Sequence, residues 1–146
     1  MLGDNAVALG YQTAATGTCS HTEGAQTKAS GQFSHAEGVN TTASGQYAHA
    51  EGVSTTASGL GSHAEGAGCI ASGQGSHAEG TGCTASGNYA YAGGSGSKAE
   101  GENSFASGGG CTALGYADHA EGYTTIAGLK GYYVQGVGGP NKTDYY

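Results

Sequence analysis

Histidine and glutamate recur two residues apart along this chain, a pairing that can bind a metal ion or form buried hydrogen bonds. The sequence Ser-His-Ala-Glu-Gly occupies residues 34–38 and returns with small changes elsewhere. Residues two apart on a strand share a face, so the side chains of His35 and Glu37 are expected to lie together. Imidazole and carboxylate suit zinc, iron or nickel, but they also satisfy each other as hydrogen-bond donor and acceptor. Because His-x-Glu is not a specific metal motif, we favour hydrogen bonding and predict no metal and no cofactor.

These pairs belong to a 14-residue repeat that fills residues 1–126 as nine blocks without insertion. If the first residue of each block is position 1, glycine stands at positions 3 and 10 of every block, and alanine at positions 1 and 8 of eight blocks. Each half of a block alternates with period two, which predicts a short strand that ends in a glycine turn with positive φ. Each block should therefore form one coil of two strands, and the coils should stack at ~4.8 Å as a parallel β-solenoid.

The composition fits a narrow solenoid and excludes an ordinary layered core. Glycine contributes 31 residues, Leu, Ile, Val and Phe together contribute only 14, and tryptophan is absent. The uniformly small residues at positions 13, 1, 6 and 8 are predicted to point into the coil. The net charge of −7 argues against a nucleic-acid partner. No apolar run approaches the ~20 residues of a membrane span, and the segment after Met1 does not resemble a signal peptide.

Cysteine and serine offer little chemistry in this pattern. Cys69, Cys83 and Cys111 take position 13, where other blocks have Thr or Ser, and Cys19 takes position 5. Adjacent coils would bring Cys69 near Cys83, but in-register side chains rarely reach the dihedral angle of a disulfide, so we favour free thiols. Serine and histidine are neighbours on a strand and face opposite sides, which prevents them from acting as a catalytic pair. We predict no catalytic residues and no enzyme.

Positions 7 and 9 form the outward face that is best suited to a partner. Where position 7 is not His it is Val, Tyr or Phe, and such a face is expected to be buried. Because Ala and Ser already fill the coil, the covering surface must be another chain. The predicted interface residues are Val7, Leu9, His21, Glu23, His35, Glu37, His49, Glu51, His63, Glu65, His77, Glu79, Tyr91, Phe105, His119 and Glu121.

The segment Asn5-Ala-Val-Ala-Leu-Gly10 and its degraded copy at residues 103–108 resemble the motif of YadA-like heads in trimeric autotransporter adhesins. The resemblance covers residues 1–126. It implies an all-β, left-handed parallel β-roll that trimerises through positions 7 and 9. The Ser-His-Ala-Glu-Gly form departs from this motif by placing His and Glu where the adhesins have Val and Ile, and it resembles repeats of phage and prophage tail fibres. In such a trimer we expect the neighbouring carboxylates to raise the pKa of each imidazole.

The C-terminal segment, residues 127–146, is expected to leave the period. It would then form a cap on the last coil or a junction to a further domain. The alternative is an aromatic contact surface for a glycan or for the next fibre domain, formed by Tyr132, Tyr133, Tyr145 and Tyr146.

These observations predict a structural and adhesive fibre segment outside the cell. The first hypothesis is a phage-type tail fibre or spike that presents a host-contact surface on the virion. The second is the head of a bacterial surface adhesin, and the third is a self-assembling extracellular filament. A partial ladder of Thr and Ser on the opposite face leaves an ice-binding solenoid as a minor alternative. The predicted partners are two further copies of the chain, a host-surface glycan or protein receptor, and adjacent fibre domains.

Overall fold

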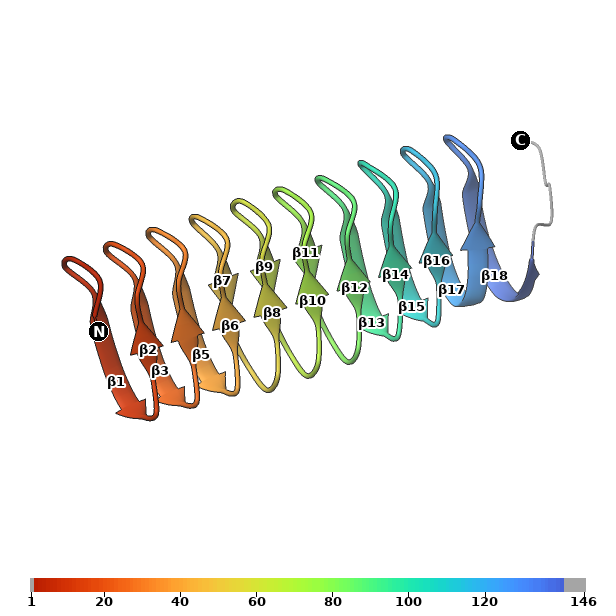
Figure 1. Cartoon of the computed structure of the whole chain (residues 1–146). Coiled ribbons are helices and arrows are strands. Elements are labelled where there is room, and N and C mark those ends of the chain that lie inside the picture. Colours follow the sequence, from red (N-terminus) through yellow and green to blue (C-terminus); the bar gives the residue numbers. More distant parts are fainter. Residues whose placement is uncertain (1, 141–146) are drawn as a thin grey trace.

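The computed structural model describes residues 2–140 as a rod of stacked coils that runs from β1 at one end to β18 at the other (Figure 1). Every strand pair is parallel and joins residues 14 apart, as in His21↔His35 and Ala29↔Ala43. The predicted all-β parallel solenoid of 14-residue coils is confirmed. Among residues 2–140, no helix is long and apolar enough to cross a membrane.

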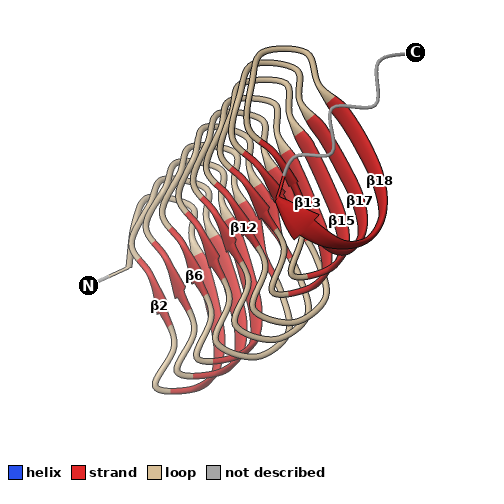
Figure 2. Cartoon of the chain, turned by 90° about the vertical axis from the view of Figure 1, so that its right-hand side faces the viewer, coloured by secondary structure: helices blue, strands red, loops and turns tan. Residues whose placement is uncertain are grey.

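Two stacks of strands line opposite flanks of the flattened coil (Figure 2). The first stack holds positions 7 to 11 and consists of β1 (Val7–Tyr11), β3 (His21–Ala25), β5 (His35–Val39), β7 (His49–Ala50), β9 (His63–Ala64), β11 (His77–Ala78), β13 (Tyr91–Ser95), β15 (Phe105–Gly109), the first part of β17 (His119–Ala127) and β18 (Tyr133–Pro140). The second stack holds positions 14 and 1 and consists of β2 (Ala14–Ala15), β4 (Lys28–Ala29), β6 (Thr42–Ala43), β8 (Thr56–Ala57), β10 (Ile70–Ala71), β12 (Thr84–Ala85), β14 (Lys98–Ala99), β16 (Thr112–Ala113) and the end of β17.

The interior of the rod is filled by small side chains, as predicted. The alanines at positions 1 and 8 are fully buried from Ala29 to Ala127. Most serines at position 6 are buried with their hydroxyls donating to the position 3 carbonyl of the same coil, as Ser20 does to Gly17 at 2.7 Å. The buried hydroxyl of Ser104 has no partner among residues 2–140.

Position 13 accepts Thr, Ser or Cys because its side chain needs to be small rather than hydrogen-bonded. The hydroxyls of Thr27 and Thr41 are buried and have no hydrogen-bond partner among residues 2–140. The hydroxyl of Thr55 donates to the backbone oxygen of Glu51 at 3.0 Å, so a hydrogen bond occurs at this position but is not required. Cys69 and Cys83 are buried here as free thiols, and burial raises the pKa of the Cys69 thiol.

The invariant glycines are required for two different reasons. At position 10 φ lies between 93° and 140° in every described coil, so the predicted positive-φ turn is confirmed there. At position 3 the prediction of positive φ is wrong. There the missing Cβ allows adjacent coils to approach, because a Cβ built on Gly45 would overlap the carbonyl oxygen of Gly59.

Positions 5 and 12 of each coil adopt a left-handed backbone that the sequence analysis did not anticipate. Their φ angles lie between 53° and 76°, even for Phe33 and Ser54. In the strands an N–H group donates to the following coil, as Val7 does to Ser20 (2.9 Å). At positions 5 and 12 it donates to the preceding coil, as Phe33 does to Thr18 (2.9 Å). The left-handed residues are therefore the points at which the backbone reverses the direction of its hydrogen bonds.

The winding continues past residue 126. β18 pairs with β17 in the same register, from His119↔Tyr133 to Ile126↔Pro140. Residues 127–140 thus form a tenth coil, and the expectation that they leave the period is wrong. The repeat persists here because position 10 is still glycine and position 1 is still alanine. Residues 141–146 lie outside the described part of the chain, and a role of the segment as a cap or junction stays a prediction.

Asp118 connects the ninth and tenth coils at the point where the glycine repeat fails. Position 3 of the tenth coil is Leu129 rather than glycine. Asp118 replaces the usual serine at position 6 and is 1% exposed. Its carboxylate accepts hydrogen bonds from the backbone N–H groups of Gly115 (2.6 Å) and Tyr132 (2.9 Å). The side chain therefore supplies the acceptor for the Gly115 N–H group, a role that an alanine carbonyl of the next coil has elsewhere, as Ala113 does for Gly101 (3.3 Å).

Candidate functional site

A continuous column of rings runs along the rod at position 7. In-register parallel pairing places the same repeat position in each coil next to its equivalent, so a ring repeated every 14 residues becomes a stack. Adjacent ring centroids lie 4.5–5.5 Å apart. We call this set the position 7 column, and its members are His21, His35, His49, His63, His77, Tyr91, Phe105, His119 and Tyr133.

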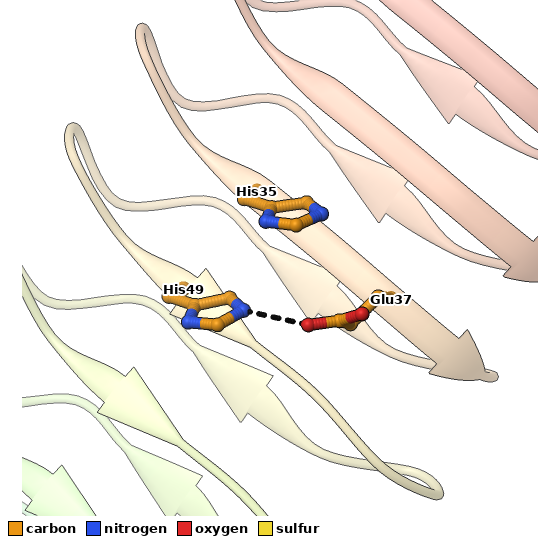
Figure 3. A group of neighbouring side chains, drawn as sticks. All are labelled: His35, Glu37 and His49. Carbon is orange, nitrogen blue, oxygen red and sulfur yellow. Dashed lines mark hydrogen bonds and ion pairs between the residues drawn. The ribbon is translucent and has the colours of Figure 1, made fainter.

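Three glutamates at position 9 form hydrogen bonds with the imidazole of the next coil. The Nε2–Oε1 distances are 3.0–3.2 Å in the pairs His49–Glu37, His63–Glu51 and His77–Glu65. Figure 3 shows the first pair and the parallel ring of His35 beside it. The hydroxyl of Tyr91 donates to Glu79 in the same way. The hydrogen bonds that the sequence suggested between chains are thus formed between coils of one chain.

The position 7 column is only partly covered by its own chain. The paired histidine side chains are 31–36% exposed, and their glutamates are 32–45% exposed. Neighbouring coils cover the faces of the rings, so the exposed part is their outer edge. Val7 and Leu9 at the start of the same face are about half exposed. One mixed apolar and polar face therefore lies open along the length of the rod.

Three successive clusters on this face bring together atoms that can ligate a metal. In each cluster the imidazole nitrogens and the carboxylate oxygen lie within 4.8 Å of one another. The clusters are His35–Glu37–His49, His49–Glu51–His63 and His63–Glu65–His77. Sequence spacing alone pointed to pairs, whereas the stacking of coils creates groups of three.

Comparison with known protein families identifies the repeat. The family model of the YadA head domain repeat matches residues 2–18, 36–62 and 85–110. The matched segments are similar to YadA head repeats. A search of curated proteins finds no match to the sequence.

YadA head repeats are found in trimeric autotransporter adhesins, where they assemble as homotrimers at the cell surface. They form a structural and adhesive family rather than an enzymatic one. The match at residues 36–62 includes one coil with His and Glu at positions 7 and 9, which carries His49 and Glu51.

The electrostatics of the position 7 column differ from expectation at His35. Burial, followed by the nearby imidazole of His49, lowers the pKa of His35, and the opposing charges of Glu37 and Glu23 do not compensate. In the single chain the pKa shift of His35 is therefore opposite to the one expected for a trimer. Its Nε2 has no hydrogen-bond partner among residues 2–140, because Glu23 Oε1 lies 4.0 Å away. Burial would raise the pKa of Glu37, but its hydrogen bond with His49 and the imidazole charges outweigh burial and lower it.

Mild acid should destabilise the repeats. The pKa of His35 in the folded state lies below its unfolded value of 6.5. The neutral imidazole therefore makes its full contribution to the stability of the folded state at pH values above 6.5. It is lost as the pH falls through 6.5 toward the folded pKa. The lowered pKa of Glu37 acts in the same direction at lower pH, since its contribution is lost as the pH falls through its folded pKa. We expect the melting temperature, followed by circular dichroism, to fall between about pH 7.5 and 5, and His35→Val to flatten this fall near 6.5. A wild-type protein that melts higher at about pH 5.5 would contradict this assignment.

The tyrosines of the C-terminal segment have separate locations. Tyr133 stacks on His119 with centroids 4.5 Å apart, and so extends the position 7 column. Tyr132 is half-buried and packs against the alanine core. Tyr145 and Tyr146 lie outside the described residues. Tyr133 was not predicted as a member of the position 7 column, although its distance of 14 residues from His119 was a sufficient signal.

Proposed function

We propose that this chain is an adhesive fibre segment whose three copies pack through the position 7 column and the glutamates at position 9. The observation that carries the proposal is the half-exposed face of rings and carboxylates, which is continuous along the rod. YadA head repeats assemble as homotrimers in adhesins, and this face corresponds to the positions at which the resemblance places the contacts between chains.

The composition of the coil supports coupled folding and assembly. The core consists almost entirely of alanine, serine, threonine and cysteine. Such small side chains bury little apolar area per residue, so a single chain gains little to offset its conformational entropy. Covering the exposed edges of His, Tyr and Phe by neighbouring chains would add the missing stabilisation.

Sedimentation of matched variants tests the interface. Wild-type protein at low micromolar concentration should sediment as a trimer. Phe105→Asp places a charge within the column and should shift the protein to a smaller species, because an unpaired buried charge is costly. Leu114→Asp makes a comparable change at an exposed apolar residue of position 2 and should leave the trimer intact. A folded monomeric wild type, or dissociation by Leu114→Asp alone, would contradict the interface.

Two of the settings expected for such a fibre have one supporting observation each. Histidine and glutamate at positions 7 and 9 support a phage-type tail fibre, because that form resembles tail-fibre repeats. The match to the YadA head model favours the head of a bacterial surface adhesin. Neighbouring genes for tail assembly would support the phage setting, and an outer-membrane anchor encoded in the same reading frame would support the adhesin. Binding of the trimer to a glycan array, with and without residues 127–146, tests the adhesive role in either setting.

A further inference from the structure

Exposed apolar side chains are distributed unevenly around the coil. Of the 17 large apolar side chains that are exposed among residues 2–140, only Leu2, Ile70 and Leu114 lie on the second stack of strands and the position beside it. The other 14 lie on the first stack or in the turns that join the two stacks (Figure 2). Apolar side chains that gather on one side of a rod mark a surface for a partner.

The two turns of each coil form two apolar edges. We call positions 3 to 6 the first turn and positions 10 to 13 the second turn, and the position 7 column runs between them. The exposed apolar residues of the first turns are Phe33, Tyr47, Leu60, Tyr89, Tyr116 and Leu129. Those of the second turns are Tyr11, Val39, Val53, Tyr123 and Val137. The apolar surface is therefore wider than the column itself and continuous with it.

Both edges are almost free of charge. The sequence places no charged residue in any second turn, and the first turns of the third to seventh coils have none either. Between Lys28 and Lys98 the only acidic residues are the glutamates at position 9. Two such edges can approach each other without removing a charge from water, which is the main cost of burying polar surface.

Threefold symmetry determines what each edge meets. If the first stack faces the axis of a trimer, rotation by a third of a turn places the first turns of one chain beside the second turns of the next. Such a contact is heterologous, because it joins two different surfaces, and three of them close a ring. In parallel rods, coils of the same level then lie side by side.

The third and fourth coils carry matching apolar residues on their two edges. Phe33 and Tyr47 are 47% and 57% exposed in the first turns, and Val39 and Val53 are 46% and 51% exposed in the second turns. The rings of Phe33 and Tyr47 already stack in parallel, with centroids 5.4 Å apart. Because these rings are held in place by each other, covering them costs little additional side-chain entropy.

We propose that in the trimer the first-turn edge of each chain packs against the second-turn edge of its neighbour, with Phe33 and Tyr47 facing Val39 and Val53. This inference rests on the proposed trimer and gives each chain a contact beyond the position 7 column. The second stack, with its few exposed apolar side chains, then forms the outer surface of the assembly.

Disulfide trapping in the full chain tests which edges meet. Cys19 is an exposed free thiol at position 5 of the second coil, and Ala25 is at position 11 of the same coil. Within one chain strand β3 separates the two positions by more than about 10 Å, whereas a disulfide needs Cα atoms within about 7 Å. Ala25→Cys, or Gln26→Cys beside it, should therefore give a covalent trimer on a non-reducing gel after mild oxidation.

Two controls accompany the trapping. Lys28→Cys places an exposed thiol on the second stack and should give no covalent trimer. Adding Cys19→Ser to Ala25→Cys should abolish the trimer band, because the linkage needs one thiol from each edge. A wild type that sediments as a trimer, with no covalent trimer from either Ala25→Cys or Gln26→Cys, would overturn the edge contact alone. A monomeric wild type would overturn the proposed trimer as well.

A charge pair across the same contact gives an independent test. Tyr47→Lys and Val53→Asp should each weaken the trimer at least tenfold in sedimentation, because each places one unpaired charge in an apolar contact. Combining them in one chain should recover most of the loss, since the opposite charges then face each other between neighbouring chains. Ile70→Asp on the second stack is the matched control and should leave the trimer unchanged. A double variant as weak as the two single losses combined would overturn the pairing.

Discussion

Gly45→Ala should destabilise the solenoid by about 3 kcal/mol per chain, although it adds a single methyl group. The added Cβ would overlap the carbonyl oxygen of Gly59 in the next coil. That carbonyl belongs to a backbone held by hydrogen bonds from coil to coil, so it cannot move without separating the two coils. Denaturant unfolding followed by circular dichroism measures the loss.

Substitutions at two other glycines distinguish the effect of close approach between coils from the effect of backbone conformation. Gly61 has φ 62° and open space around an added Cβ, so Gly61→Ala should cost only about 1 kcal/mol, the penalty of a left-handed backbone. Gly52 combines φ 101° with a Cβ that would overlap the carbonyl oxygen of Gly66, so Gly52→Ala should cost the most, about 4 kcal/mol. Equal stabilities for Gly45→Ala and Gly61→Ala would show that the coils can separate without cost.

Asp118→Ala should release the tenth coil and leave the rest of the rod wound. The substitution leaves the N–H group of Gly115 without its acceptor, and the N–H group of Tyr132 keeps only Leu129 O at 3.2 Å. The loss of about 3 kcal/mol is concentrated at one junction. Hydrogen–deuterium exchange should therefore accelerate in residues 127–140. Exchange in coils from β3 to β12 should stay as slow as in the wild type.

Asp118→Asn and Asp118→Ser are the matched controls for that junction. The asparagine carbonyl oxygen keeps one of the two acceptors, so Asp118→Asn should show an intermediate effect. Serine is the residue of most other coils at position 6, but its single short hydroxyl cannot accept from both N–H groups. Asp118→Ser should thus behave like Asp118→Ala. If hydrogen–deuterium exchange accelerated uniformly along the whole rod, the tenth coil would not be a separate unit of unfolding.

The strand arrangement and core could be predicted because each repeat position occupies the same environment in every coil. Only small residues occur at positions 1, 6, 8 and 13, since the coil interior admits nothing larger until Asp118 at the last junction. The left-handed backbone at positions 5 and 12 was harder to predict from the sequence. Phe33 and Tyr47 occupy position 5, and neither type marks that conformation. The four consecutive glycines at position 12, from Gly68 to Gly110, were the signal that could have shown it.

The candidate site was predicted in composition but not in geometry. Period-two spacing correctly placed His and Glu on one face. It could not show that Glu37 reaches the imidazole of the next coil, because that depends on how side chains lean along the rod. It also could not show the tilt of His77, which lies between a histidine and a tyrosine rather than between two histidines. The lowered pKa of His35 follows from an unpartnered buried nitrogen that no spacing rule reveals.

The unbroken 14-residue register also determines how such a rod can change over generations. Every coil offers the same edge to the next, so duplication or deletion of one repeat unit in the gene would lengthen or shorten the rod by a single step of ~4.8 Å. The remaining coils would keep their contacts and their faces in line. Slippage between near-identical repeats in the coding sequence would then change the length of the rod without requiring a new fold. Any insertion of another size would interrupt the ring stack.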